Sequence, residues 1–123
     1  MPRTAACCLA GRRVEFDRQD EAPLLMRLHR ADAHRDIRPT LALAQPQRSV
    51  AVITGDGELL MGIGTLATIG AKQPANLSIV VLDNGHYGET GMQRSHTSLG
   101  TNLVDVARGF GLPNAHATHD LKD

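Results

Sequence analysis

The sequence predicts an α/β fold in which a parallel sheet is built from βαβ units. Two apolar runs rich in β-branched residues, "SVAVIT" at 49–54 and "NLSIVVLDN" at 76–84, are separated by a stretch with helical periodicity. A second amphipathic helical pattern follows at 101–112. Strands that alternate with helices in this way are typical of parallel sheets joined by crossover connections.

The first strand of the unit is expected at 49–54. Before it, "LALAQPQR" (41–48) has the pattern of the last turns of a helix, which Pro46 would stop. The strand itself is continuously apolar, as expected when both faces of a parallel sheet are covered. The tripeptide at 55–57, Gly-Asp-Gly, then forms the turn into the next helix.

One continuous helix is expected at 58–73, with four apolar residues near one face. These residues are Leu59, Ile63, Leu66 and Ile69. Residues 62–67, "GIGTLA", also match a dinucleotide-binding fingerprint, but they lie inside the helix rather than directly after a strand. We therefore expect Gly62, Gly64 and Gly70 to allow close packing of the helix on the sheet, and a NAD site is the less favoured alternative.

The second strand, at 76–84, is followed by a long polar loop, "GHYGETGMQRSHTSLG". A helix is expected at 101–112, ended by Gly111 and Pro113. The final "HATH" (116–119) places two histidines three residues apart. A metal-binding pair is compatible with this spacing, but a frayed tail is the favoured interpretation.

Residues 1–40 differ in composition from the rest of the chain, and the sequence does not assign a fold to them. They hold only one of the 12 glycines, and "EAPLLMRLHRADAHRDI" (21–37) shows one short helical stripe. Cys7 and Cys8 are the only cysteines, and adjacent cysteines suit neither a disulfide nor a metal knuckle. We therefore divide the chain into an unassigned N-terminal segment, foreign or disordered, and a partial domain at 41–123.

Composition excludes several classes of function. The formal net charge is zero, and the chain has two Phe, one Tyr and no Trp, which argues against a nucleic-acid-binding surface. The apolar runs are far shorter than the roughly 20 residues that span a bilayer. No signal peptide is visible at the start. The sequence therefore predicts a reduced, cytoplasmic protein that binds neither nucleic acid nor membrane.

Polar side chains follow both predicted strands. Asp56 comes just after the first strand, and Asn84 ends the second, one complete βαβ return later. If the two strands are neighbours, these side chains converge at one edge of the sheet. Both offer the hard oxygen ligands that Mg²⁺ prefers, and Mg²⁺ usually bridges such ligands to phosphates. Because the next helix points free N–H groups to the same place and Gly57 permits close approach, the turn predicts a metal–diphosphate anchor.

The stretch "GDGELLMGIGTLATIGAKQPANLSIVVLDNGHYGET" (55–90) resembles the cofactor motif of thiamine-diphosphate-dependent enzymes. The resemblance covers about residues 41–112. "LDNGHYGETGMQ" is most similar to the C-terminal diphosphate-binding domain of sulfopyruvate and phosphonopyruvate decarboxylases. It implies a partial thiamine-diphosphate-binding fold. In that fold Mg²⁺ is held by Asp56, Asn84 and the backbone carbonyl of His86, and backbone groups of Gly57 and Glu58 meet the diphosphate.

The resemblance also marks the residues around the cofactor. The predicted cofactor-binding set is Gly55, Asp56, Gly57, Glu58, Asn84, His86 and Tyr87. His86 and Tyr87 are expected to face the cofactor or substrate, although a solvated turn would explain them equally well. Glu89, Thr90 and Gln93 are weaker candidates for binding the anionic end of a substrate. Many members of the wider family have Asn where this chain has Asp83, and the decarboxylases tolerate Asp there.

The implied function is that of the thiamine-diphosphate- and Mg²⁺-binding component of a decarboxylase for a small anionic 2-oxo acid. In this family a glutamate on a separate pyrimidine-binding domain activates the cofactor, and nothing before residue 41 matches that domain. We therefore expect a pyrimidine-domain partner subunit or a homo-oligomer, and no turnover by the chain alone. The last strand and helix of the domain are not matched either, so we expect a truncated domain. A catalytically inactive fragment is the alternative.

Overall fold

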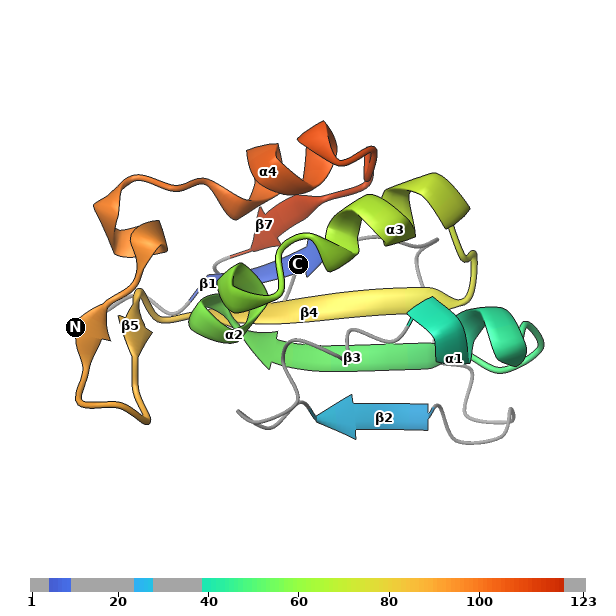
Figure 1. Cartoon of the computed structure of the whole chain (residues 1–123), viewed down its shortest axis with the longest axis horizontal. Helices are drawn as coiled ribbons and strands as arrows, with labels where there is room; N and C mark the ends of the chain where they lie inside the picture. Colours follow the sequence, from blue (N-terminus) through green and yellow to red (C-terminus); the bar gives the residue numbers. More distant parts are fainter. Residues whose placement is uncertain (1–4, 10–23, 28–38, 119–123) are drawn as a thin grey trace.

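The computed structural model of the chain describes residues 5–9, 24–27 and 39–118. These residues form a five-stranded sheet in the order β2-β3-β4-β1-β7 and a separate two-stranded hairpin (Figure 1). The strands of the large sheet are β1 (Ala5–Leu9), β2 (Leu24–Arg27), β3 (Val50–Gly55), β4 (Leu77–Asp83) and β7 (His116–Thr118).

The centre of the sheet is parallel, as the sequence predicts. β3 pairs in parallel with β4, with Gly55 opposite Leu82, and β2 pairs in parallel with β3. β1 is antiparallel to both of its neighbours, β4 and β7, so the sheet as a whole is mixed. The predicted α/β class and the βαβ unit are thus confirmed, and the antiparallel strand is an addition that the sequence did not indicate.

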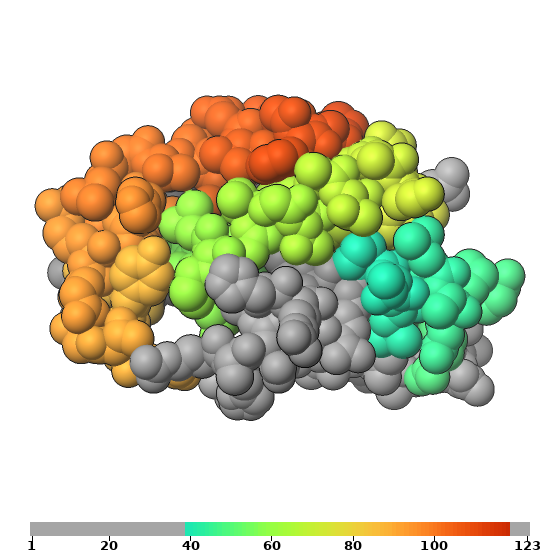
Figure 2. All heavy atoms as spheres, in the orientation of Figure 1, coloured from blue at the N-terminus to red at the C-terminus, as the bar shows by residue number. Residues whose placement is uncertain are grey.

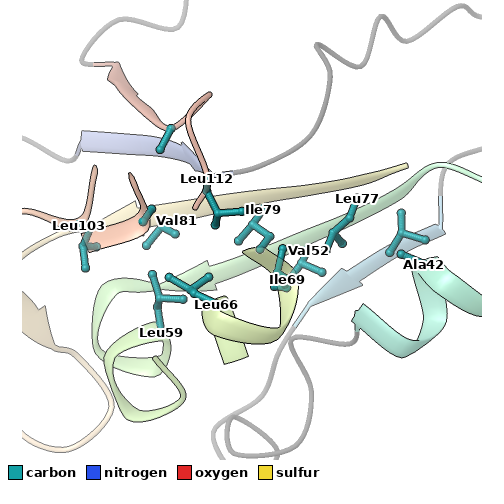
Figure 3. Packing of buried hydrophobic residues seen from close by; sticks show 13 residues of the cluster. Ala42, Val52, Leu59, Leu66, Ile69, Leu77, Ile79, Val81, Leu103 and Leu112 are labelled. Carbon is teal, nitrogen blue, oxygen red and sulfur yellow. The ribbon is translucent and has the colours of Figure 1, made fainter. Parts of the chain in front are cut away.

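Four helices lie on one face of this sheet (Figure 1). They are α1 (Pro39–Ala44), α2 (Asp56–Met61), α3 (Thr65–Lys72) and α4 (Leu103–Gly109). In Figure 3 Ile69 of α3 lies beside Val52 and Ile79 of the strands, and Leu59 of α2 lies toward Val81; all of these side chains are buried. Along β4 burial alternates, and Leu82 on the opposite face is exposed, so the core lies on the helix side.

The helix expected at 58–73 is two helices. α2 ends at Met61, and α3 begins at Thr65 after a turn that contains Gly62 and Gly64. Each glycine costs a helix about 1 kcal/mol relative to alanine, so two in three residues favour a break. A Cβ at Gly64 would meet nothing within 4 Å, so the close packing expected there is wrong. Gly70 does allow a close approach, but its neighbour is the backbone of Phe110 at the end of α4, so the expected packing on the sheet is wrong there as well.

The polar loop after β4 contains regular structure. β5 (His86–Tyr87) and β6 (Gln93–Arg94) pair as a hairpin, and the 3₁₀ helix η1 (His96–Leu99) follows. The hairpin extends beyond the carboxyl ends of β3 and β4, at the left of Figure 1. The helix expected at 101–112 is confirmed as α4, and the Asn102 side chain caps it by accepting the Val104 and Asp105 N–H groups.

Two interpretations at the ends of the chain are wrong. The helical stripe expected at 21–37 includes β2, because these residues pair with β3; residues 28–37 lie outside the described part. Residues of the expected frayed tail form β7, because they pair with β1; His119 of the suggested metal pair is not described. Cys7 and Cys8 lie in β1. The domain boundary at residue 40 stays a prediction.

Gly70→Ala is expected to destabilise the fold. A Cβ at this position would overlap the carbonyl oxygen of Phe110, so the end of α4 must move away. Overpacking of this kind costs roughly 1–3 kcal/mol in the free energy of unfolding, which urea denaturation would measure. Gly64→Ala is the control, since its Cβ has open space and the change is expected to stay within about 1 kcal/mol. Equal effects of the two substitutions would contradict the close approach at Gly70.

Candidate functional site

The predicted site lies at the carboxyl ends of two neighbouring parallel strands. Asp56 is the first residue of α2 and follows β3 directly, while Asn84 follows β4. The register of the two strands, with Gly55 opposite Leu82, brings both positions to the same edge of the sheet. The expectation that β3 and β4 are neighbours, on which the convergence of these two side chains depended, is therefore confirmed.

A cavity of about 560 Å³ opens at this edge. All seven predicted cofactor-binding residues line it: Gly55, Asp56, Gly57, Glu58, Asn84, His86 and Tyr87. Glu89 and Thr90 also line it, and Gln93 does not. In Figure 2 an opening lies between the atoms of α2 and those of the hairpin. Its volume is within the range of small-molecule sites, and apolar and polar groups share its wall.

Asp56 is a buried carboxylate held by hydroxyl groups. The residue is 2% exposed. Its Oδ2 accepts a short hydrogen bond from Ser95 Oγ and lies 3.0 Å from Thr97 Oγ1. Among the described residues no lysine or arginine forms an ion pair with it, and none donates to its Oδ1. Burying a charge without a cationic partner is costly, and hydrogen bonds from hydroxyl groups offset only part of that cost.

Glu58 uses its side chain to fix the start of α2. Its Oε2 accepts the Gly55 N–H at 3.1 Å and the Thr54 hydroxyl at 3.1 Å. This is the contact that a glutamate at the third helical position makes with the residue before the helix. The glutamate carboxylate therefore braces the turn, and only the backbone of Glu58 is left for the role that the sequence assigned to it.

The turn after β4 is built from side chains that accept backbone N–H groups. Asp83 Oδ1 accepts from Gly85 at 3.0 Å, and Asn84 Oδ1 accepts from His86 at 2.9 Å. His86 Nδ1 lies 2.9 Å from the Asn84 carbonyl, which can only accept, so Nδ1 carries a proton. In the neutral imidazole Nε2 is then the acceptor on a residue that lines the cavity.

The Tyr87 ring packs against Gly57. A Cβ on Gly57 would overlap this ring, so glycine is required for the contact between α2 and the hairpin. The sequence analysis assigned Gly57 to the approach of a phosphate, and it did not foresee the neighbouring ring. Tyr87 is half-buried and lines the cavity, so it closes one side of the site.

Ser95 and Thr97 are site residues that the sequence analysis missed. They lie in the segment at β6 and η1, and Thr97 Oγ1 also lies 2.7 Å from Asp83 Oδ1. Short polar residues in a polar loop carry no local pattern that points to a buried contact. Ser95 is connected with the site only by its hydrogen bond to Asp56, which lies 39 residues earlier in the chain.

The described part of the chain contains no group of three or more His, Cys, Asp or Glu placed to hold a metal. The predicted ligand set does not need one, because it consists of one carboxylate, one amide and one backbone carbonyl. Nor does any helix among the described residues have the length and apolar character needed to cross a membrane.

The fold is that of an α/β protein with a cavity at the carboxyl ends of its parallel strands. Proteins of this class bind nucleotides and related cofactors at that position. Residues 40–123 match the family "Thiamine pyrophosphate enzyme, C-terminal TPP binding domain", and the chain belongs to this family. The resemblance drawn from the GDG turn and Asn84 is thereby confirmed.

Decarboxylases are among the similar proteins. The chain is 51% identical to sulfopyruvate decarboxylase subunit beta of Methanocaldococcus jannaschii over 63 residues, 51% of this chain and 34% of that protein. It is 46% identical to phosphonopyruvate decarboxylase of Streptomyces viridochromogenes over 83 residues, 68% of this chain and 20% of that protein. It is 42% identical to sulfopyruvate decarboxylase subunit beta of Methanothermobacter thermautotrophicus over 81 residues, 66% of this chain and 43% of that protein. The chain thus spans less than half of each relative.

Gly57→Ala is expected to move the Tyr87 ring. Tyr87 is the only tyrosine and the chain has no tryptophan, so intrinsic fluorescence reports on this ring alone. Because a Cβ at Gly57 would overlap the ring, we expect stronger acrylamide quenching in the variant. Gly109→Ala is the control, since a Cβ at this glycine of α4 would meet nothing within 4 Å. Unchanged quenching in Gly57→Ala would contradict the contact.

Proposed function

We propose that this chain is the thiamine-diphosphate- and Mg²⁺-binding component of a 2-oxo acid decarboxylase. Its substrate would be a small 2-oxo acid with a second anionic group, as in the sulfopyruvate and phosphonopyruvate named for its relatives. The observation that carries the proposal is the Asp56 carboxylate, buried at the cavity without a cationic partner among the described residues. Membership of the thiamine-pyrophosphate-binding family supports the choice of cofactor.

The donor chemistry fits Mg²⁺. The proposed ligands are Asp56, the side chain of Asn84 and the backbone carbonyl of His86, all hard oxygens on residues that line the cavity. A divalent cation would supply the positive charge that the buried carboxylate lacks. Because Mg²⁺ keeps phosphate oxygens in its coordination shell, the same ion would fix the diphosphate of the cofactor beside Gly57 and Glu58.

Thiamine diphosphate, when bound, supplies an ylid that serves as the electron sink for decarboxylation. The residues of this chain would bind and orient the cofactor at its diphosphate end. Tyr87 closes the wall of the cavity against Gly57, which limits the access of water at that side. His86 lines the same wall, and with its Nδ1 proton directed at the Asn84 carbonyl its Nε2 would be free to accept from a donor of the cofactor or substrate.

A second chain would complete the site. The residues that match the family are those of the C-terminal cofactor-binding domain, and two of the similar proteins are named as beta subunits. Met61 and Leu82, both on the cavity wall, are 43% and 47% exposed, which suits a surface that another protein covers. We propose a pyrimidine-domain partner that supplies the activating glutamate. The homo-oligomer and the cytoplasmic location expected from the sequence stay predictions.

Asp56→Ala is expected to abolish metal-dependent binding of thiamine diphosphate. The substitution removes the only carboxylate among the proposed ligands. We expect at least about a 100-fold loss of affinity, since even changes around metal ligands cost roughly 10–100-fold. Calorimetric titration with Mg²⁺ and thiamine diphosphate measures it, and Asp105→Ala, an exposed aspartate on α4, is the charge-matched control. Wild-type affinity in Asp56→Ala would rule out the metal anchor.

The purified chain is expected to show no decarboxylation above free cofactor, even when it is saturated with Mg²⁺ and thiamine diphosphate. Acid–base assistance of the kind that the activating glutamate supplies is worth roughly 10²–10⁴-fold in rate. The assay is release of carbon dioxide from sulfopyruvate, phosphonopyruvate and pyruvate, with and without a co-expressed pyrimidine-domain subunit. Turnover by the chain alone would contradict the need for a partner.

A further inference from the structure

Two hydroxyl groups from a distant segment meet on one oxygen of the Asp56 carboxylate. Ser95 is completely buried, and its Oγ donates to Asp56 Oδ2. Thr97 Oγ1 lies 3.0 Å from the same oxygen. The terminal torsion of an aspartate is broad and roughly two-fold when nothing holds it. These two contacts therefore fix the orientation of the carboxylate, with one oxygen, Oδ2, directed at the loop.

The hydroxyl protons can be assigned by counting them. Each hydroxyl has one proton to donate and can accept two. Ser95 gives its proton to Asp56, and Thr97 Oγ1 lies 2.8 Å from Ser95 Oγ and 2.7 Å from Asp83 Oδ1. Thr97 can therefore donate to only one carboxylate at a time, and it lies within hydrogen-bonding distance of both Asp56 Oδ2 and Asp83 Oδ1. Thr97 in this way links the carboxyl ends of β3 and β4.

The other oxygen of Asp56 is left for a ligand. Both loop contacts are made to Oδ2, none of the described residues donates to Oδ1, and Asp56 lines the cavity. We propose that Ser95 and Thr97 are positioning residues, which orient the Asp56 carboxylate so that Oδ1 binds the divalent cation. The inference rests on the proposed function and adds two residues that the ligand set does not contain.

The competing explanation is that the two hydroxyls only anchor the loop. Ser98 separates the two explanations, because it lies in the same 3₁₀ helix and anchors the same segment without touching a carboxylate. Its Oγ donates to the Ser95 carbonyl at 2.9 Å and accepts from Arg94 Nε at 3.2 Å. Ser98→Ala therefore weakens the loop and leaves the Asp56 contacts in place.

The test measures binding of Mn²⁺ alone to the full chain, by electron paramagnetic resonance and calorimetry. Mn²⁺ takes the same hard oxygen ligands as Mg²⁺ and is visible by resonance. Thr97→Val and Ser95→Ala are each expected to weaken Mn²⁺ binding about 10–100-fold, the usual effect of removing a group that orients a metal ligand. Thr97→Ser, which restores the hydroxyl, is expected to bind within a few-fold of wild type, as is Ser98→Ala.

Circular dichroism without metal checks that each variant is folded, and Ser95→Ala, which removes a single oxygen, carries the test if Thr97→Val does not fold. If the wild-type chain binds Mn²⁺ and both Thr97→Val and Ser95→Ala bind it with the same affinity, the positioning role is overturned and the proposed cofactor site is not. An equal loss in Ser98→Ala would also overturn it. A wild-type chain that binds no Mn²⁺ would overturn the proposed cofactor site together with the positioning role.

Discussion

The buried carboxylate of Asp56 is the constraint to which the rest of the site is fitted. A carboxylate that is 2% exposed loses several kcal/mol of hydration, and hydrogen bonds recover only part of this cost. Ser95 and Thr97, which lie 39 and 41 residues later in the chain, contact the Asp56 carboxylate. Asp56 forms no ion pair with any other described residue. A charge that arrives with a ligand, as in the proposed magnesium site, would offset the rest of this cost.

Two close approaches at glycine fix how the helices and the hairpin pack in the surrounding fold. The Tyr87 ring lies on Gly57, so the hairpin is seated on the first turn of α2. Gly70 allows α3 to meet the end of α4 at Phe110, and the helix pair covers the core side of β3 and β4. The contact between α2 and the hairpin does not tolerate a side chain at Gly57, and the contact between α3 and the end of α4 does not tolerate one at Gly70.

The sequence predicted those parts of the fold that have a local pattern. Apolar runs located β3 and β4, and because parallel strands end at a common edge, the sequence alone places Asp56 and Asn84 together. The hairpin, the break before Thr65 and the role of Thr97 escaped prediction. The break before Thr65 comes from two glycines inside an otherwise helical pattern, and the hairpin strands are two residues long and carry no apolar alternation. The Thr97 contacts join segments far apart in the chain, which local periodicity does not encode.

In the proposed site Asp83 places a second acidic side chain near Asp56, and Thr97 lies between the two. Asp83 Oδ1 accepts the Gly85 N–H and the Thr97 hydroxyl, and the amide oxygen of an asparagine could accept both. Aspartate at this position therefore adds charge and no new acceptor contact. Two carboxylates that share the Thr97 hydroxyl repel each other when no cation is near and jointly attract one when it is. Asp83 would thus make the proposed site less favourable without an ion, and it would strengthen the preference of the site for a divalent ion over a neutral ligand.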